Sequence, residues 1–339
     1  MIRKSFSENM VPETLPPVTD YLSTGCTILD LAIADRLPGG FAAGRISHIF
    51  GPESSAKSVL VAEPLGAAQR KGGKVTLVDA EGTYDFGRSM LFGLNPDDMV
   101  YISGAEEEIS IEFLFDTVFQ KGEKIAKDCG KPSAIGIDSL SSIPSVVELE
   151  DDLSTTGYGV SRAKQLSKGF RTHIGALVHS NLALIFIDQT RQNISGMGKK
   201  YVFSGGDALK FYASTRVLVE KKANILNKFK KPIGIEVAFR VEKNKIAPPY
   251  RDGIFSLLFD YGIDDVRTNI QWLKENDPNS DKKSAWFTLP GLDKKFNSIE
   301  AAIIVVEKEG LEKTLRKKVY HVWKEIYHRT RRKERVRDE

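Results

Sequence analysis

The feature that most constrains the fold of this 339-residue chain is a loop with the composition of a phosphate-binding P-loop, made of Gly51, Pro52, Glu53, Ser54, Ser55, Ala56, Lys57 and Ser58. The loop follows an apolar run, ISHIF, and precedes a helical pattern, which is the context that a P-loop requires. Backbone N–H groups of such a loop, together with the N-terminus of the helix, hold phosphate oxygens. We therefore expect Lys57 to reach the β- and γ-phosphates of ATP, and the Ser58 hydroxyl to ligate Mg²⁺.

Ala56 departs from the P-loop pattern. It occupies the position of the motif's second glycine, where a Cβ atom restricts φ and crowds the phosphates. The alternative interpretation of the segment is a serine-rich turn that precedes a helix by chance. The order of strand, loop, Lys-Ser pair and helix favours the P-loop. We expect Ala56 to weaken nucleotide binding or to slow hydrolysis without abolishing either.

Short apolar strands alternate with longer helical stretches from about Leu22 onward. This alternation is typical of β-α-β crossovers, which build a mainly parallel sheet covered on both faces. The later strands have shorter connections and are expected to form an antiparallel extension. The predicted fold class is therefore α/β with a twisted, mainly parallel sheet. The expected strands are 46–50, 75–78, 134–137, 182–187, 215–219 and 236–241.

Changes in composition divide the chain into three predicted regions. Residues 1–21 contain three prolines and are expected to form an N-terminal arm that packs on a neighbouring protomer. Residues 22–263 are expected to form the ATPase and DNA-binding core. After Gly262, segments rich in Asn, Asp, Pro and Lys precede one helix from Ser298 to about Tyr327. Residues 264–339 are therefore predicted to be a small α+β C-terminal domain with a basic helix and tail.

Two acidic residues are expected to complete the nucleotide site. The apolar run 134–137 ends at Asp138, where a carboxylate beside a P-loop holds Mg²⁺ through water. The run 75–78 leads to Glu81, at the carboxyl edge of the sheet, where ligands of open α/β sheets bind. A carboxylate there can orient the attacking water as a general base. Considered alone, Asp138 is typical of a turn and Glu81 of a surface loop, but the P-loop upstream favours the catalytic interpretation.

Composition indicates a cytoplasmic protein with no membrane partner. The chain is 41% hydrophobic, has no uninterrupted apolar run of the length of a membrane span, and begins without the apolar stretch of a signal peptide. Two cysteines, Cys26 and Cys129, fit no disulfide framework or metal-binding spacing. We expect both to be small packing residues.

Positive charge is concentrated in two parts of the chain, although the net charge is only +4. From Lys313 to Arg337 there are eleven Lys or Arg and two acids. Such clusters attract phosphate backbones, but they are also typical of solvated helix faces and tails. The second cluster consists of Lys221, Lys222, Lys228, Lys230 and Lys231.

Several segments carry a resemblance to a known family: GPESSAKS, VDAEGTYD, IDSLSSI, IFIDQTRQ, SGGDALKFYASTR and VEKNKIAPPY. With these segments in this order, the chain resembles the RecA family of homologous recombinases over about residues 22–263. GGDALKFYASTR and KNKIAPPY are specific to that family among P-loop ATPases. The short N-terminal arm and the divergent C-terminus are more similar to a phage-encoded or distant member than to the standard bacterial protein.

The resemblance implies a RecA-type ATPase that binds ATP and Mg²⁺. It further implies a helical filament on single-stranded DNA that promotes pairing and strand exchange with homologous duplex DNA in recombination and repair. In such a filament the nucleotide lies at the interface between protomers. Single-strand-binding and loader proteins are the further partners that the resemblance implies.

The resemblance also assigns roles to individual residues. Glu81 matches the family's catalytic glutamate, and Gln189 matches the glutamine that senses the γ-phosphate. Lys243 and Lys245 match two lysines that reach the ATP of the neighbouring protomer. Without the resemblance, the KNK segment is typical of a solvated hairpin turn.

The adenine and DNA contacts are carried over in the same way. Asp85 matches an acid near the base, whereas Arg88 and Phe259 stand where bacterial members have stacking tyrosines, which puts the strength of stacking in doubt. Loops at about 148–162 and 193–206 are expected to hold DNA, as glycine- and lysine-rich segments suit backbone binding. The expected DNA-binding residues are Arg162, Ser195, Gly196, Lys199, Lys200, Gly205, Gly206, Lys210 and Arg216.

Two other functions remain open from the sequence. One is a RecA-fold ring ATPase or helicase, against which the KNK and GGDALKFYASTR segments argue. The other is a non-hydrolysing or slow DNA-binding mediator, which Ala56 favours and Glu81 disfavours. The basic C-terminal helix and tail are interpreted either as a site that captures the incoming duplex or as a solvated surface.

Overall fold

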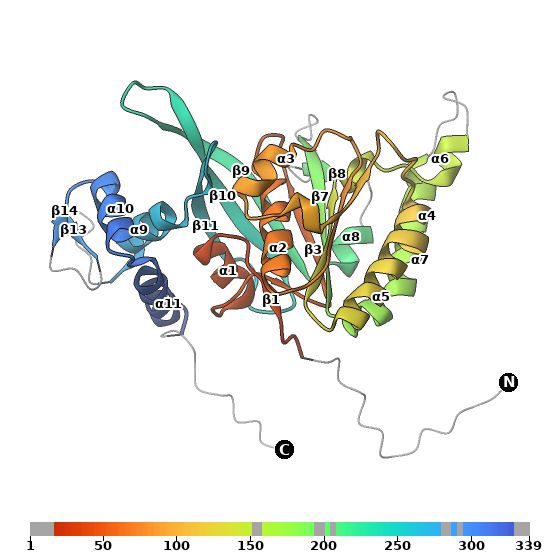
Figure 1. Cartoon of the computed structure of the whole chain (residues 1–339), viewed down its shortest axis with the longest axis horizontal. Helices are drawn as coiled ribbons and strands as arrows, with labels where there is room; N and C mark the ends of the chain where they lie inside the picture. The colour runs from red at the N-terminus through yellow and green to blue at the C-terminus, as the bar shows by residue number, and fades with distance from the viewer. Residues whose placement is uncertain are drawn as a thin grey trace, which may run out of the picture.

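A ten-stranded sheet forms the centre of the part of the chain that the structure, a computed structural model, describes (Figure 1). The described residues are 17–150, 158–192, 201–203, 208–278, 286–289 and 294–328. Along the sheet the strands follow the order β12-β11-β10-β9-β3-β7-β6-β4-β5, and β8 pairs with β7. The strands are β3 (Ile46–Gly51), β4 (Val75–Asp79), β5 (Val100–Ser103), β6 (Ser133–Asp138), β7 (Leu182–Gln192), β8 (Tyr201–Phe203), β9 (Thr215–Leu226), β10 (Pro232–Asn244), β11 (Asp252–Leu258) and β12 (Gly262–Ile263).

The predicted α/β class and all six expected strands are confirmed. Strands β3, β4, β5, β6, β7 and β9 run parallel to one another. Strands β10, β11 and β12 continue the sheet antiparallel from β9, as expected from their short connections, and β8 is antiparallel to β7. Four strands of this sheet were not anticipated: β5, β8, β11 and β12. β5 and β11 are short runs that mix polar and apolar residues, and β12 has only two residues.

Helices cover both faces of the parallel part of the sheet (Figure 1). Helices α1 (Thr27–Ala34) and α2 (Val59–Arg70) lie on one face, and α5 (Gln120–Cys129) and α7 (Tyr158–Val178) lie on the other. Alternate residues of β7 show how the faces are filled: Ile185 and Ile187 pack with the first pair of helices, and Leu184 and Phe186 pack with the second. This alternation buries the strands on both sides, as expected for a parallel sheet. Shorter helices are α3 (Phe86–Leu91), α4 (Ile111–Phe113), α6 (Val146–Glu150) and α8 (Ala208–Tyr212).

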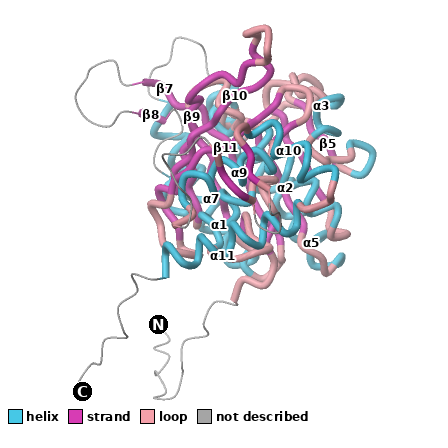
Figure 2. Tube along the Cα trace, turned by 90° about the vertical axis from the view of Figure 1, so that its left-hand side faces the viewer, coloured by secondary structure: helices cyan, strands magenta, loops and turns pink. Residues whose placement is uncertain are grey.

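The hairpin of β9 and β10 extends well beyond the rest of the sheet. Residues 215–218 of β9 pair with β3, and residues 219–226 continue past the end of that pairing. Eight residues of strand span about 26 Å. In Figures 1 and 2 the hairpin projects from the same end of the molecule as the ends of β7 and β8.

The C-terminal region forms helices α9 (Asp265–Asn276), α10 (Ile299–Lys308) and α11 (Glu312–His328), with the small hairpin β13 (Phe287–Thr288) and β14 (Lys295–Phe296). The single helix expected from Ser298 to Tyr327 is wrong. Gly310 has a φ of +64°, a left-handed conformation that ends an α-helix, so α10 and α11 are separate. The apolar stripe on these helices does face inward, and Val306, Leu315, Val319 and Val322 are buried.

Two carboxylates join the C-terminal helices to the core. Asp265 accepts hydrogen bonds from the Thr27 N–H (2.7 Å) and hydroxyl (2.8 Å) and from Arg316 Nε (2.8 Å). Asp35, at the end of α1, accepts from Trp323 Nε1 at 3.1 Å. The buried residues of both regions form one continuous apolar cluster, so the domain boundary at 263/264 stays a prediction. Within the described ranges, no helix has the length and apolarity needed to span a bilayer.

We predict that Trp323→Ala lowers the free energy of unfolding by about 3–5 kcal/mol, because it leaves a cavity between α11 and the core. Trp323 is fully buried and its ring lies 5.9 Å from that of Trp272. Urea denaturation followed by circular dichroism measures the change. Trp286→Ala is the matched control, since this side chain is 53% exposed and should cost less than about 0.5 kcal/mol. Equal losses from the two variants would contradict the proposed packing.

Candidate nucleotide and DNA-binding site

The ends of four parallel strands bring the predicted catalytic residues together. Gly51 of β3 pairs with Gln189 of β7, and Asp138 of β6 pairs with Asp79 of β4. Strands β4, β6, β7 and β3 are consecutive in the sheet, so the P-loop, Gln189, Asp138 and the Glu81 segment all lie at one carboxyl edge. Ligands of open α/β sheets bind at this edge.

Lys57 and Ser58, which are predicted to bind phosphate and Mg²⁺, directly precede α2. Lys57 is largely buried and its Nζ donates to the Pro52 carbonyl at 2.6 Å, so the side chain folds back over the loop. Burial lowers the pKa of Lys57 from its usual value. Ser58 Oγ donates to Asp138 Oδ2 at 2.6 Å, which joins the P-loop to the end of β6. Gly51 could not carry a side chain, because a Cβ there would lie 2.0 Å from the carbonyl oxygen of Val219.

Ala56 and Ser54 both adopt the left-handed backbone conformation, with φ of +67° and +57°. An L-residue in this region costs roughly 1–2 kcal/mol, a cost that glycine avoids. The replacement of the motif's second glycine by Ala56 therefore strains the backbone of the loop. The loop keeps the conformation for which the motif has glycine and stores strain at that residue.

The carboxylates at this edge fit a divalent cation that is bound chiefly by a nucleotide. Burial raises the pKa of Asp138, and the nearby Asp79 and Glu81 raise it further, although the Ser58 hydrogen bond opposes them. A cation would relieve this accumulation of negative charge. Among the described residues no three His, Cys, Asp or Glu side chains converge on a metal position. Mg²⁺ suits this arrangement, since it usually takes one or two protein ligands plus phosphates and waters.

Glu81 and Gln189 are exposed at the same edge. Ser142 Oγ donates to Glu81 Oε1 at 3.0 Å, and the Glu81 N–H donates to Asp79 Oδ1 at 3.2 Å. The first bond links the loop after β4 to the turn after β6. An exposed carboxylate held in this way can receive a proton from water bound next to a phosphate.

The elements expected around adenine lie close to one another, although only part of them is described. Asp85 is exposed and Phe259 is 40% exposed, whereas the side chain of Arg88 on α3 lies outside the described set. Gly262 approaches Phe92 just after α3: a Cβ at Gly262 would lie 3.1 Å from the ring. The turn after β11 therefore meets the end of α3.

Lys243 and Lys245 lie at the opposite end of the sheet from their own P-loop. Lys243 pairs with Arg216, at the start of β9, and the start of β9 pairs with Ser47, near the start of β3. Lys243 Nζ donates to the carbonyls of Lys210 (2.7 Å) and Phe211 at the end of α8. Burial, with help from Lys245, Arg216 and Lys210, lowers the pKa of Lys243 to about 8. Lys245 is exposed.

The predicted DNA-binding residues are only partly described. Arg162 is buried, and its guanidinium donates to the carbonyls of Ser141 (3.1 Å) and Leu140, so in this structure it holds the segment after β6. Arg216 is buried as well, and Lys210 on α8 is half-buried. Six residues lie outside the described part of the chain: Ser195, Gly196, Lys199, Lys200, Gly205 and Gly206. Their roles stay predictions.

A row of polar side chains, buried except for the half-buried Glu242, crosses four strands, and the sequence did not reveal it. His48 Nε2 on β3 lies 3.0 Å from Asp188 Oδ2 on β7, next to Gln189. Arg216 Nε on β9 donates to His48 Nδ1 at 3.2 Å, and Arg216 Nη1 lies 3.4 Å from Glu242 Oε2 on β10, next to Lys243. An arginine only donates, so His48 must be neutral with its proton on Nε2. A polar His48 inside the apolar run ISHIF was the available signal.

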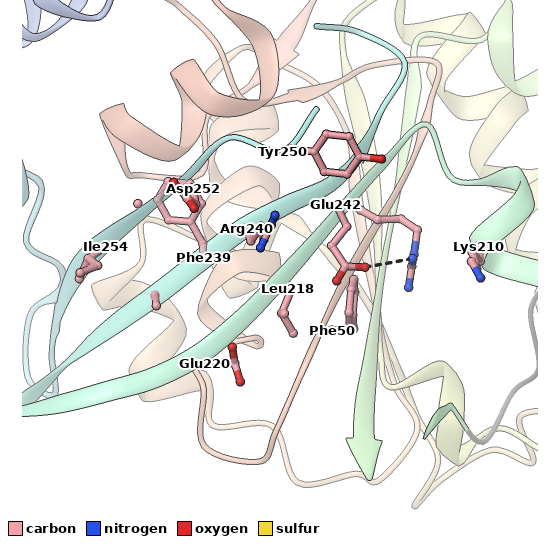
Figure 3. Close-up of a pocket in the computed structure, with 13 residues that line it drawn as sticks. Phe50, Lys210, Leu218, Glu220, Phe239, Arg240, Glu242, Tyr250, Asp252 and Ile254 are labelled. Atoms are coloured by element: carbon pink, nitrogen blue, oxygen red, sulfur yellow. Dashed lines mark hydrogen bonds and ion pairs between the residues drawn. The ribbon is translucent and has the colours of Figure 1, made fainter. Parts of the chain in front are cut away.

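The row ends in a cavity on the surface of the sheet (Figure 3). This cavity of about 910 Å³ lies on the face of β9, β10 and β11 and is lined by Phe50, Leu218 and Arg240, among others. Figure 3 shows Glu242 on its wall, with Lys210 to one side, and the ion-pair partner of Glu242 is Arg216. Apart from Phe50, it includes none of the residues next to the P-loop. The cavity is therefore distinct from the nucleotide site.

Comparison with known proteins agrees with this geometry. A family model described as the RecA N-terminal domain matches residues 9–264. A protein named Protein RecA from Campylobacter jejuni is 35% identical over 280 residues, which is 82% of this chain and 76% of the relative. The chain belongs to the RecA family. RecA proteins of Gluconobacter oxydans and Synechocystis are 34% and 33% identical, over 80% of this chain and 74% and 73% of theirs.

Membership of the RecA family confirms the resemblance seen in the sequence and the fold class. The family consists of ATP- and DNA-binding recombinases that hydrolyse ATP with Mg²⁺ in a DNA-dependent manner. In this chain the predicted site residues of the P-loop, Asp138, Glu81 and Gln189 lie at one sheet edge.

We predict that Ala56→Gly leaves ATP affinity and hydrolysis equal to wild type or raises them. An L-residue at φ +67° is strained by about 1 kcal/mol, and glycine removes this strain. The greater freedom of glycine in the unfolded chain offsets part of the gain in stability. Nucleotide titration and steady-state ATPase assays measure the effect. Ala67→Gly, in the interior of α2, is the control and should destabilise the protein by about 1 kcal/mol. A large loss of ATP affinity in Ala56→Gly would contradict the explanation.

We predict that His48 makes the protein sensitive to mild acid. Burial lowers the pKa of His48, although Asp188 opposes the shift, so the folded state binds a proton less readily than the unfolded state. Stability is therefore full above the unfolded pKa of about 6.5 and is lost as the pH falls toward the folded value. Asp188, Arg216 and Glu242 are the charged groups that face the ring.

Two variants test this prediction. His48→Gln keeps a donor and an acceptor without titrating, so urea denaturation at pH 7.5 and 5.5 should show less acid sensitivity than wild type. His48→Leu removes the partner of two buried charges and should cost about 3 kcal/mol at pH 7.5. Acid sensitivity in His48→Gln equal to that of wild type would place the titrating group elsewhere.

Proposed function

We propose that this protein is a DNA-dependent ATPase that assembles on single-stranded DNA as a helical filament and promotes homologous pairing and strand exchange. The observation that carries the proposal is the division of the catalytic residues between two ends of the sheet. Lys57, Ser58, Asp138, Glu81 and Gln189 lie at the carboxyl edge, and Lys243 and Lys245 lie at the other. A complete site therefore requires a second protomer, and a head-to-tail contact of this kind builds an open filament when it does not close.

The chain's own residues would divide the work of hydrolysis. The P-loop N–H groups and Lys57 bind the phosphates, and Ser58 and Asp138 hold Mg²⁺, which offsets the charge of the phosphate oxygens. Glu81 orients the attacking water and accepts its proton. Gln189 lies on the strand next to the P-loop and leads into residues 193–200, so contact with a terminal phosphate is coupled to the DNA-binding segment.

Lys245 of a neighbouring protomer would supply positive charge to the same phosphates, as an arginine finger does. Lys243, predicted to reach the same ATP, also has a structural task. Its bonds to the Lys210 and Phe211 carbonyls fix the end of α8, which follows the second predicted DNA loop. Lys245 is therefore the cleaner residue for testing catalysis across the interface.

A slow or non-hydrolysing mediator is the second candidate, and the strained φ of Ala56 favours it. Glu81 and Gln189, which are both predicted to act in hydrolysis, are present at the carboxyl edge and favour an active ATPase instead. ATPase rates with and without single-stranded DNA, together with negative-stain images, distinguish an active filament from a mediator and from a ring.

We predict that Glu81→Gln and Lys245→Ala complement each other in mixed filaments. Glu81→Gln should bind ATP and DNA but lose general-base catalysis, worth about 10²–10⁴-fold in rate. In an equal mixture about one quarter of the interfaces pair an intact Glu81 with an intact Lys245, so the DNA-stimulated ATPase should recover toward one quarter of wild type. The measurement is the rate of ATP hydrolysis on poly(dT) as the ratio of the two variants in the mixture is changed.

The matched control is a mixture of Glu81→Gln with Lys57→Ala. Both of these residues belong to the same protomer's half of the site, so each site in that mixture carries one defect. This mixture should stay inactive. If the Glu81→Gln and Lys245→Ala mixture were no more active than the sum of its parts, the shared site would be excluded.

A further inference from the structure

Tyr84 lies in the loop that follows β4, between Glu81 and α3, and it belongs neither to the predicted catalytic residues nor to the predicted Mg²⁺ ligands. The Ala80 N–H donates to the Asp138 carbonyl at 2.9 Å, so this loop begins in contact with the end of β6. The Tyr84 N–H donates to Asp79 Oδ2 at 2.8 Å, and Asp79 is opposite Asp138 in the sheet. Tyr84 is therefore held at the same edge as the predicted nucleotide site.

Packing fixes the direction of the Tyr84 side chain. Its ring forms a T-shaped pair with the ring of Phe86, with centroids 5.7 Å apart, and lies 6.5 Å from the ring of Tyr101. It also packs on the apolar cluster that includes α2. Because the hydroxyl of a tyrosine lies on the axis of the ring, these contacts fix the position of the hydroxyl as well.

The Tyr84 hydroxyl is buried, and it has no hydrogen-bond partner among the described residues. The hydroxyl of Tyr101 differs, because it donates to Asp79 Oδ2 at 2.9 Å. A buried hydroxyl without a partner destabilises a fold, and a phenylalanine would fill the same space without that cost. Packing of the ring therefore does not account for the hydroxyl group.

Asp138 is the acid that acts most strongly on this hydroxyl. Burial raises the pKa of Tyr84, and of the nearby acids the carboxylate of Asp138 raises it most. Asp138 Oδ2 accepts from Ser58, whereas no described residue donates to Oδ1. The hydroxyl and Oδ1 are thus two unpaired groups of one site that do not bond to each other directly. A water molecule between two such groups can bond to both.

We propose that Tyr84 is a positioning residue whose hydroxyl orients a water ligand of the Mg²⁺ ion that Ser58 and Asp138 hold with ATP. The proposal rests on the proposed function in taking Mg²⁺ and ATP as the ligands of this site. Mg²⁺ usually keeps several of its waters when it binds to a protein. Such a water has two protons to donate, and Asp138 Oδ1 and the Tyr84 oxygen are acceptors for them. A neutral phenol does this without adding negative charge beside Asp138.

The test compares three full-length variants. Tyr84→Phe removes the unpaired hydroxyl and keeps the ring. Tyr101→Phe removes a neighbouring hydroxyl that has a partner, and Tyr320→Phe, on α11 in the C-terminal region, is the neutral control. A fluorescent ATP analogue is titrated in excess Mg²⁺ and in EDTA. The stability of the nucleotide-free protein is measured in EDTA by urea denaturation.

We expect Tyr84→Phe to lower the affinity for the analogue about fivefold to tenfold in Mg²⁺ and to leave the affinity in EDTA unchanged, because one hydrogen bond to a water ligand is lost. Without nucleotide, Tyr84→Phe should unfold at a higher urea concentration than wild type, since the unpaired hydroxyl is gone. Tyr101→Phe should unfold at a lower urea concentration and keep the Mg²⁺ dependence of wild type. Tyr320→Phe should match wild type in both measurements.

Three results would overturn the proposal. A nucleotide-free Tyr84→Phe protein that is less stable than wild type, as Tyr101→Phe should be, would give the hydroxyl a purely structural role. An equal loss of affinity in Mg²⁺ and in EDTA would place the hydroxyl against the nucleotide itself. An unchanged affinity in both would exclude it from the site. Absence of Mg²⁺-dependent binding of the analogue in wild type would instead reject the proposed function, whatever the variants do.

Discussion

The register between β3, β7, β6 and β4 is the constraint on which the rest of the structure depends. Alternate side chains of these strands pack into two separate apolar clusters, one on each face. A slip of one residue would exchange the faces, placing His48 and Asp188 among the apolar side chains around α2. Because burial fixes the register, the ends of the strands are fixed as well. Gly51 stands beside Gln189 and Asp138 beside Asp79 for that reason.

The same register creates the polar row from the buried Asp188 to the half-buried Glu242. One end of the row adjoins Gln189 at the candidate nucleotide site, and the other adjoins Lys243, which holds the end of α8. Each member occupies a neighbouring strand, so a displacement of one strand changes the hydrogen bonds of the next. Buried polar networks of this kind tolerate few intermediate arrangements, because an unpaired member carries a large desolvation cost. The row physically connects two regions that the sequence separates by more than fifty residues.

The strands and the P-loop could be predicted because their signals are local. A run such as ISHIF followed by a Lys-Ser pair specifies strand, loop and helix within about fifteen residues. β5 and β11 gave weaker signals, since Val100 lies exposed at the edge of the sheet and the side chains of β11 differ in burial. The break between α10 and α11 depends on one glycine within an otherwise continuous apolar pattern. A helical stripe predicts which residues are buried better than it predicts where a helix ends.

The sequence by itself determined the fold class, the family and the identity of the residues at the candidate nucleotide site, because each of these depends on short motifs and their order. The resemblance implied that Lys243 and Lys245 reach the ATP of a neighbouring protomer, but no motif fixed where they lie relative to Glu81 in their own chain. Only the tertiary structure decided that Lys243 and Lys245 lie at the far end of the sheet, since strand pairing across β10, β9 and β3 sets that distance. It also decided the partners of His48, Arg162 and Asp265. These properties arise from contacts between residues far apart in the chain, and no local pattern encodes such contacts.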